Sequence, residues 1–331
     1  MIIVTNMDDD VLNTIFYAFE VGDLSWPNGN ILFLNGQIDQ RFPDSIEIQQ
    51  FFKPLADKAF SHIPENKSYD LIILHAPRQQ IEMRYYIGHA LNLMNKTGHI
   101  ICVASNDAGG RRLKDEIKKC GIEPSVISKN KCQLVYFKPD GLTAPNWINQ
   151  GQAQEVLSGS FISQPGIYGW NKVDTGSELL INTLTSHNFG GVGADFGCGY
   201  GYLSDGILKL KNDIQKIYYI DADSRALECA KANFNATCKA DYLWLDLRHE
   251  IKNIEPLDWI VMNPPFHQKK ETNYKIGEQF ITTASKALKK SGSLWMVANV
   301  HLPYERVFKD KFSDVEKIKE AKGFKVFHAV K

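Results

Sequence analysis

Apolar runs of strand length alternate with longer mixed segments of helix length along most of the chain. Four clear runs span residues 31–34, 70–74, 217–220 and 258–262. Strand-like runs that alternate with helix-like segments are typical of βαβ units, which build parallel sheets flanked by helices. The pattern therefore predicts an α/β protein.

Turn-forming residues interrupt this alternation near the middle of the chain. The turn signals there are Pro139-Asp140-Gly141, Pro145-Asn146, Ser158-Gly159-Ser160 and Pro165-Gly166. Such clusters favour loops and linkers, and 331 residues are more than one hydrophobic core usually serves. We therefore expect one domain over residues 1–140, a linker over 141–165 and a second domain over 166–331.

The two halves share a sequence pattern. Asp70-Leu-Ile-Ile-Leu-His-Ala-Pro-Arg aligns with Asp258-Trp-Ile-Val-Met-Asn-Pro-Pro-Phe, and Gly98-His-Ile-Ile-Cys-Val-Ala aligns with Gly292-Ser-Leu-Trp-Met-Val-Ala. So long a period favours two copies of one fold over a solenoid; chance likeness between α/β domains is the alternative. The first copy has no glycine-rich turn, so we expect it to lack a cofactor and to recruit substrate or support the second domain.

Composition indicates an ordinary globular protein, since 44% of the residues are hydrophobic and 23% are charged. The net formal charge of +0 argues against binding of nucleic acid through overall charge, although a local basic face can still bind it. Basic residues gather from Arg306 to Lys325, and earlier as Arg111, Arg112, Lys114, Lys118, Lys119, Lys129 and Lys131. Each group is either an RNA-binding surface or a solvated helix face.

The 6 cysteines form no CxxC pair and no Cys/His spacing that suits zinc, so reduced thiols and no metal are expected. The first residues have no basic segment followed by an apolar core, as a signal peptide would. Apolar stretches all fall short of the ~18 residues that a membrane span needs. These features predict a cytoplasmic protein.

A glycine-rich loop follows the apolar strand that ends in Asp195. It reads Asp195-Phe-Gly197-Cys198-Gly199-Tyr-Gly201 and precedes a probable helix. Glycine lets the backbone turn tightly and approach a ligand that a Cβ would exclude. The rival interpretation is a dinucleotide site, but that fingerprint is G-x-G-x-x-G and uses the helix N-terminus for pyrophosphate. The G-x-G-x-G spacing with an acid before it fits S-adenosylmethionine, which has no phosphate.

Three acids at expected strand ends are candidate cofactor contacts. Asp195 could bind the amino acid end of S-adenosylmethionine directly or through water, and Asp221 could accept both ribose hydroxyls. Asp246 ends the segment 242–246, so it is either a partner of adenine N6 or a loop acid. Farther upstream, Thr175 and Glu178 fit a helix capping box, and the same stretch could instead cover the cofactor.

The turn Asn263-Pro264-Pro265-Phe266 suits methylation of a base amine. The lone pair of such an amine is delocalised into the ring, and two hydrogen-bond acceptors around its N–H groups oppose that delocalisation. The Asn263 side-chain oxygen and the Pro264 carbonyl can serve, and two prolines stiffen the turn. Phe266 can stack on a flipped base. A plain turn after a strand is the alternative.

These motifs resemble the bacterial small-subunit ribosomal RNA guanine-N2 methyltransferase C family. The resemblance rests on the glycine loop, Asn-Pro-Pro-Phe-His, the octapeptide Val-Ala-Asn-Val-His-Leu-Pro-Tyr at 297–304, and Lys-Val-Phe near the end, and it covers nearly the whole chain. It implies two tandem Rossmann-like class I methyltransferase domains. Each would be a mostly parallel seven-stranded sheet flanked by helices, and the N-terminal copy would be degenerate.

The resemblance also implies the activity, which is methylation of guanine N2, at G1207, in the 16S RNA of the small ribosomal subunit. Carried over by position, the cofactor-binding residues are Asp195, Gly197, Cys198, Gly199, Gly201, Asp221, Asp246 and Asn263, and the residues that hold the base are Asn263, Pro264, Pro265 and Phe266. The chain departs from the family at Asp246, which is often an amide there, and at His75-Ala-Pro-Arg78, which replaces what is usually a Pro-Lys turn.

Other functions fit parts of the sequence. A sister family methylates guanine N2 in 23S RNA with the same motifs, and related enzymes methylate adenine or protein glutamine. A ribosome-assembly factor that uses the cofactor only structurally is a further alternative, although a binder has no need to keep Asn263 and Pro264. We expect a monomer, because tandem domains can satisfy each other's interface.

Overall fold

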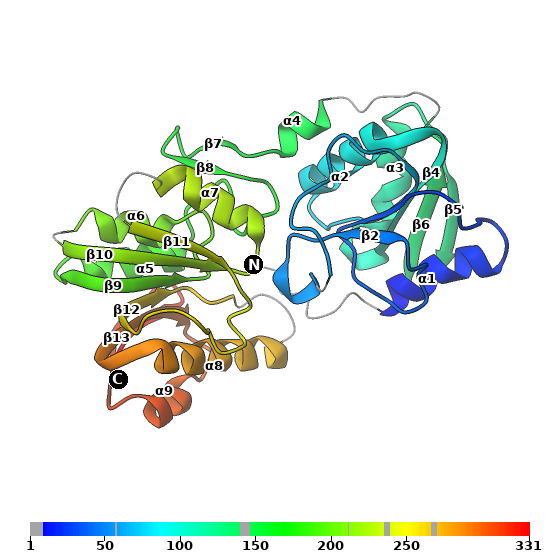
Figure 1. Cartoon of the computed structure of the whole chain (residues 1–331). Coiled ribbons are helices and arrows are strands. Elements are labelled where there is room, and N and C mark those ends of the chain that lie inside the picture. Colours follow the sequence, from blue (N-terminus) through cyan, green and yellow to red (C-terminus); the bar gives the residue numbers. More distant parts are fainter. Residues whose placement is uncertain (1–8, 57, 140–145, 211, 235–238, 266–269) are drawn as a thin grey trace. The chain divides into compact units, whose positions relative to one another are not determined.

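The computed structural model describes residues 9–56, 58–139, 146–210, 212–234, 239–265 and 270–331. The chain divides into two compact units between Gln152 and Ala153, inside the segment expected to be a linker (Figure 1). That segment carries α4 (Trp147–Gly151), which packs on α2 (Gln80–Leu93) of the first unit. It also carries the hairpin of β7 (Gln154–Val156) and β8 (Phe161–Ser163), and β8 packs on α7 (Ser224–Phe234) of the second unit.

The second unit is a seven-stranded sheet in the order β11-β10-β9-β12-β13-β15-β14. All neighbouring strands are parallel except the two pairs that involve β15. Its elements besides α7 are α5 (Thr175–Leu184), β9 (Phe189–Phe196), α6 (Tyr202–Leu208), β10 (Asn212–Asp221), β11 (Lys239–Trp244), β12 (Leu257–Met262), α8 (Lys270–Ala287), β13 (Leu288–Asn299), α9 (Glu305–Lys311), β14 (Asp314–Ala321) and β15 (Phe324–Val330).

Helices cover both faces of this sheet because successive strand residues point to opposite sides. Tyr219, Val261 and Trp295 pack against α5, α6 and α7 in one cluster. Their strand neighbours, such as Tyr218 and Ile260, pack against α8 and α9 in another. Strands buried on both faces read as continuous apolar runs, which is why the sequence shows them so plainly.

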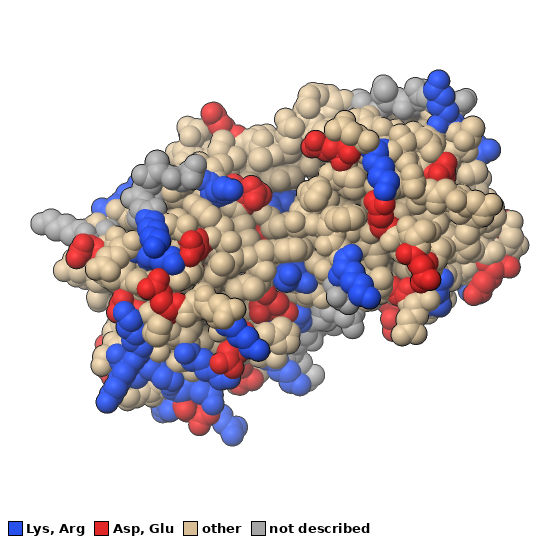
Figure 2. Space-filling model, in the orientation of Figure 1, with Lys and Arg blue, Asp and Glu red and all other residues tan. Residues whose placement is uncertain are grey.

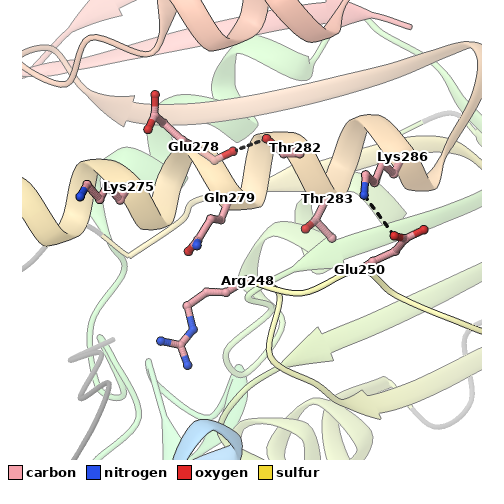
Figure 3. A pocket seen from close by; sticks show the side chains of 8 residues that line it. All are labelled: Arg248, Glu250, Lys275, Glu278, Gln279, Thr282, Thr283 and Lys286. Atoms are coloured by element: carbon pink, nitrogen blue, oxygen red, sulfur yellow. Dashed lines mark hydrogen bonds and ion pairs between the residues drawn. The ribbon is translucent and has the colours of Figure 1, made fainter.

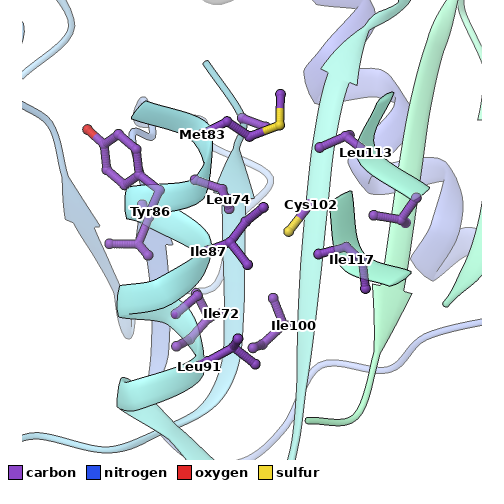
Figure 4. Packing of buried hydrophobic residues seen from close by; sticks show 14 of the residues in the cluster. Ile72, Leu74, Met83, Tyr86, Ile87, Leu91, Ile100, Cys102, Leu113 and Ile117 are labelled. Atoms are coloured by element: carbon purple, nitrogen blue, oxygen red, sulfur yellow. The ribbon is translucent and has the colours of Figure 1, made fainter. Parts of the chain in front are cut away.

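The first unit repeats this arrangement in a reduced form. Its sheet has the order β2-β1-β3-β4-β6-β5. Its elements besides α2 and α4 are α1 (Asp9–Glu20), β1 (Ile31–Leu34), β2 (Ile46–Gln49), β3 (Tyr69–His75), β4 (Met94–Ser105), α3 (Leu113–Lys118), β5 (Ser125–Lys129) and β6 (Cys132–Phe137). Helices α2 and α3 pack on one face (Figure 4), and α1 packs on the other.

The described part of this sheet has six strands, where seven were expected. Strand for strand it matches the second sheet without a partner for β11. At that place the chain makes only an isolated parallel bridge between Gln49 and Phe60. The segment between β2 and β3 contains Pro54 and Pro64, which cannot donate hydrogen bonds, and its described part has only the 3₁₀ turn Lys53–Leu55 as helix. The described part of this segment forms no further strand of the sheet.

Duplication of one fold, predicted from the sequence, is confirmed by this strand order and by a shared contact. In the first unit, Asp70 Oδ2 accepts a hydrogen bond from the backbone N–H of Asn30 at 2.8 Å. In the second, Asp258 Oδ2 accepts one from the N–H of Val192 at 2.8 Å. A glycine precedes each donor, and a Cβ there would lie 1.8 Å and 2.2 Å from the two carboxylates. Asp70 and Asp258 therefore bind equivalent backbone positions in the two copies, Asn30 next to β1 and Val192 in β9.

A tight contact between β9 and β12 yields a stability prediction. A Cβ on Gly193 would lie 1.9 Å from the Trp259 indole, whereas a Cβ on Gly190 in the same strand would meet its nearest neighbour at 3.6 Å. We expect Gly193→Ala to lower the free energy of unfolding by about 3 kcal/mol, and Gly190→Ala to change it little. Urea unfolding of both variants checks this, and equal losses would contradict the packing described.

Candidate functional site

The predicted site residues meet at one edge of the seven-stranded sheet. Strands β11, β10, β9 and β12 are adjacent and parallel, so their carboxyl ends share that edge, which is where open α/β sheets bind ligands. The glycine loop follows β9, Asp221 ends β10, Asp246 follows β11 and Asn263 follows β12. Phe266 lies outside the described residues.

The glycine loop adopts backbone conformations that favour glycine. Gly197, Gly199 and Gly201 have φ angles of +74°, +55° and +96°, a region that side chains with a Cβ rarely adopt. A Cβ on Gly201 would lie 2.2 Å from the Phe234 ring, whereas one on Gly199 would meet no described atom within 4 Å. The loop is therefore packed at Gly201 and open at Gly199. Cys198 is buried, and burial raises the pKa of its thiol well above the ordinary value.

Asp195 has one carboxylate oxygen satisfied and one that is not. Its Oδ2 accepts hydrogen bonds from Ser204 Oγ at 2.7 Å and from Ser204 N at 3.2 Å. Its Oδ1 is buried and has no partner among the described residues. Burial raises the pKa of this carboxyl to about 7. A buried acceptor without a donor is costly, so Oδ1 suits a ligand that brings one.

Asp221 fastens the end of β10 to the glycine loop. Its Oδ2 accepts a hydrogen bond from Gly199 N and its Oδ1 accepts one from Asp223 N, both at 2.9 Å. Burial raises the pKa of Asp221 to about 6. Each oxygen can accept a further hydrogen bond, so the geometry is compatible with the predicted ribose contact.

Asp246 is held by a neighbour in its own loop. Arg248 donates from Nε and Nη2 to the carboxylate at 2.6–2.9 Å, and its backbone N–H donates to Oδ1 at 3.0 Å. Burial acts to raise the pKa of Asp246, but these hydrogen bonds outweigh it and hold the pKa below the ordinary value. Of the two alternatives, the structure shows the loop acid, and the adenine contact stays a prediction.

The Asn263 side chain has a fixed orientation. Its Nδ2 donates to Asp174 Oδ1 at 2.7 Å and to Ser177 Oγ at 2.9 Å. Its Oδ1 is buried and has no partner among the described residues. Pro264 and Pro265, which follow, are both buried. The turn therefore presents an amide oxygen whose hydrogen-bonding capacity the chain itself leaves open.

Asp174 and Ser177 are site residues that the motif analysis missed. The sequence suggested Thr175 as the capping residue of this helix, but that prediction is wrong, because Asp174 is the N-cap of α5. Its Oδ1 accepts a hydrogen bond from Ser177 N at 2.9 Å, and its backbone is extended, as a capping residue requires. An acid three positions before a serine was the available signal, but its link to Asn263 spans 89 positions and is tertiary.

A groove of ≈ 380 Å³ lies between α8 and the loop that follows β11 (Figure 3). Its lining residues are Arg248, Glu250, Lys275, Glu278, Gln279, Thr282, Thr283 and Lys286. Charges of both signs face it, and Lys286 pairs with Glu250 at 3.1 Å. None of the predicted site residues lines the groove, so it lies beside the predicted cofactor site and is not part of it.

Other structural expectations concern metals, thiols and membranes. Within the described ranges, no group of three His, Cys, Asp or Glu side chains could hold a metal ion. Cys102, Cys120, Cys132, Cys198 and Cys229 are free thiols. No described helix combines the length and apolar character needed to cross a bilayer.

The chain is similar to proteins of known family. The family model described as methyltransferase small domain matches residues 158–328. Proteins named ribosomal RNA small subunit methyltransferase C are similar over most of their length. The one from Acinetobacter baumannii strain AYE is 30% identical over 80% of each chain. The one from Photorhabdus laumondii is 28% identical over 85% of this chain and 81% of that relative.

Among solved structures, the chain is similar to the T. thermophilus 16S rRNA N2 G1207 methyltransferase in complex with AdoMet and guanosine. The TM-score is 0.77 at 20% identity, over 93% of this chain and 90% of that one. At this identity the likeness shows the fold, and it confirms the predicted architecture of tandem α/β domains.

The buried carboxyls predict how stability depends on pH. Asp195 has a folded pKa of about 7 against about 3.9 when unfolded, so the folded state binds more protons between these values. Stability without ligand should therefore fall as pH rises from about 4 to about 7, and Asp221 acts in the same direction. We expect Asp195→Asn to flatten this dependence. Urea midpoints at pH 5.5 and 8 test it, and an unchanged slope in the variant would contradict the assignment.

Proposed function

This chain belongs to the ribosomal RNA small subunit methyltransferase C family, and from that premise we propose that it transfers a methyl group from S-adenosylmethionine to the exocyclic N2 of a guanine in 16S ribosomal RNA. The observation that carries the proposal is the Asn263 amide, whose nitrogen is bound by Asp174 and Ser177 while its oxygen is buried without a partner among the described residues. A guanine amino group supplies the N–H donors that such an acceptor needs.

The residues present fit the cofactor. Asp195 Oδ1 is a buried acceptor without a partner in the described chain, and the loop is open at Gly199, so a donor-bearing ligand can approach both. We assign the amino acid end of the cofactor to Asp195 and the ribose hydroxyls to Asp221. When bound, S-adenosylmethionine supplies an electrophilic methyl group.

The protein's part in the reaction is to orient the base amine. Asn263 Oδ1 and the Pro264 carbonyl would accept the two N–H groups, which turns the nitrogen lone pair out of conjugation with the ring. Rigid prolines and the two hydrogen bonds on Asn263 Nδ2 hold these acceptors in place before the base arrives. Phe266 would stack on the base. A strong general base is unnecessary, because the amine proton becomes acidic once the nitrogen is alkylated.

We propose the small ribosomal subunit as substrate and position 1207 as target, by analogy with the names of the relatives and of the T. thermophilus enzyme. The protein would act as a monomer in the cytoplasm, where ribosomes mature. The other functions considered, methylation of 23S RNA and non-catalytic assembly, become outcomes of the tests below.

The first unit would not bind cofactor, because its own side chains fill the equivalent positions. The strand register places Phe33 where the second unit has Asp195, and Gln50 where it has Asp221. Both are buried, and Gln50 is occupied: its Nε2 donates to Gly36 O at 3.0 Å and its Oε1 accepts from Phe52 N at 3.0 Å. We therefore propose a role for this unit in substrate recruitment or support.

Titration calorimetry on the full chain tests this division of labour. We expect one S-adenosylmethionine per chain, and a loss of affinity of about tenfold or more in Asp221→Asn, since each weakened hydrogen bond of this kind is worth about 1.5 kcal/mol. Two cofactors per chain would overturn the proposed inactivity of the first unit. Binding that survives in Asp221→Asn at full affinity would overturn the assigned site.

Transfer of radiolabelled methyl to small subunits that lack the modification tests the reaction. Label should appear as N2-methylguanine in 16S RNA, and Asn263→Ala should lower kcat by about 100-fold or more. Asn263→Asp should fail comparably, because a carboxylate cannot donate to Asp174 and is repelled by it. Ser177→Ala, which leaves the bond to Asp174, should lower kcat by about tenfold.

Large subunits, naked 16S RNA and DNA serve as parallel substrates. Label confined to large subunits would move the activity to 23S RNA. Cofactor binding with no label in any substrate, together with full complementation of a deletion strain by Asn263→Ala, would favour the assembly factor.

A further inference from the structure

Three arginines gather at the carboxyl edge of the six-stranded sheet. Arg78 lies in the turn after β3, and Arg111 and Arg112 lie in the turn after β4, all with exposed side chains. Arg112 Nη2 donates a hydrogen bond to the Arg78 carbonyl at 2.6 Å, which joins the two turns. Gly109 in the second turn has a φ angle of +111°, which side chains with a Cβ rarely adopt, and a Cβ there would lie 3.3 Å from Arg112 Nη2. The three arginines therefore lie in two turns that a hydrogen bond joins at the same edge of the sheet.

Six of the other cations in the described part of this unit form ion pairs with carboxylates. The ion pairs there are Arg41–Asp39, Lys67–Glu47, Arg84–Glu116, Lys119–Glu116, Lys114–Glu123 and Lys118–Glu123. Within the described residues, none of Arg78, Arg111 and Arg112 forms an ion pair. Clustered like charges without anions gain nothing for the fold, so an external anion is the partner that this surface lacks.

The internal repeat relates this edge of the first sheet to the candidate site of the second unit. Asp70 aligns with Asp258, so His75 stands where the second unit has Asn263, and Arg78 stands where it has Phe266. The inner part of the edge is closed, because Asn35 Nδ2 donates to the His75 carbonyl at 2.8 Å. Arg78 therefore takes the position that corresponds to the residue proposed to stack on the base, and its side chain is exposed.

We propose that Arg78, Arg111 and Arg112 bind backbone phosphates of the substrate RNA. The inference rests on the proposed function, which makes RNA the substrate. Guanidinium groups bind phosphate oxygens in pairs of hydrogen bonds and stay charged at all working pH values. The degenerate domain would thus keep the ligand-binding edge of its fold and use it for affinity instead of chemistry.

The second basic stretch is a weaker candidate. Lys and Arg side chains are dense over the part of the second unit that carries α9, but acidic side chains lie among them (Figure 2). The ion pairs there are Lys311–Asp310, Lys317–Glu320, Lys322–Glu178 and Lys325–Glu305. Most of that charge is therefore already compensated within the protein.

The test removes two of the arginines in the full chain. Arg78→Ala/Arg111→Ala leaves Arg112, whose hydrogen bond joins the turns. Its matched control is Lys96→Ala/Lys138→Ala, which removes two exposed cations without ion pairs among the described residues, in strand β4 and after β6. Binding of protein-free 16S RNA and of small subunits is measured against salt concentration, beside methylation kinetics and S-adenosylmethionine binding.

We expect the arginine variant to bind RNA about tenfold more weakly, with a salt slope reduced by about 1.4–1.8 for two lost phosphate contacts. KM for subunits should rise, while kcat and cofactor affinity stay unchanged and the control behaves as wild type. Unchanged RNA binding with normal methylation would overturn this inference and leave the proposed function standing. Weaker binding to subunits but not to free RNA would overturn it in favour of a ribosomal protein as partner. Absence of methylation by the wild-type protein would contradict the proposed function, whatever the arginine variant does.

Discussion

The carboxylate of Asp174 joins the start of helix α5 to the turn that contains Asn263. Its Oδ1 accepts one hydrogen bond from Ser177 N, which caps α5, and another from Asn263 Nδ2. The Asp174 carboxylate can only accept, so exchange of the amide nitrogen and oxygen would lose this bond, and the acceptor face of Asn263 is determined by the fold. The prolines that follow stiffen the backbone on the other side. The N-cap of α5 and the turn after β12 thus form one hydrogen-bonded unit, which fixes the direction in which the Asn263 oxygen points.

The buried carboxylates of the candidate cofactor site lower the stability of the protein without ligand. Burial raises the pKa of both Asp195 and Asp221, and the negative charge of Asp221 further disfavours ionisation of Asp195. The backbone donors of the glycine loop and of Ser204 satisfy only part of this pair. A site that leaves buried acceptors without donors is less stable when empty and gains most from a ligand that provides hydrogen bonds.

Sequence reasoning reached the parts of the candidate site that are contiguous in the chain. The glycine loop, Asp221 and the turn after β12 are contiguous motifs, and parallel strand order brings their ends together. It failed where contacts are tertiary. Asp174 contacts Asn263 across 89 positions of the chain, and the described part of the first sheet has six strands where the sequence led us to expect seven. Arg248 lies beside Asp246 in the sequence, yet only coordinates show that it occupies both carboxylate oxygens.

Phe33 and Gln50, which occupy the equivalent positions in the first unit, limit the substitutions that this unit can accept during evolution. Phe33 is fully buried in an apolar cluster, so an aspartate there would leave a carboxylate in the core with no donor prepared for it. An acid at Gln50 would lose the donor to Gly36, and Asn35 would still bind His75 across the gap. Each single reversion is harmful until the others are present. Substitutions that would build a cofactor site in the first unit are therefore disfavoured one at a time, whereas its exposed residues can change without disturbing the core.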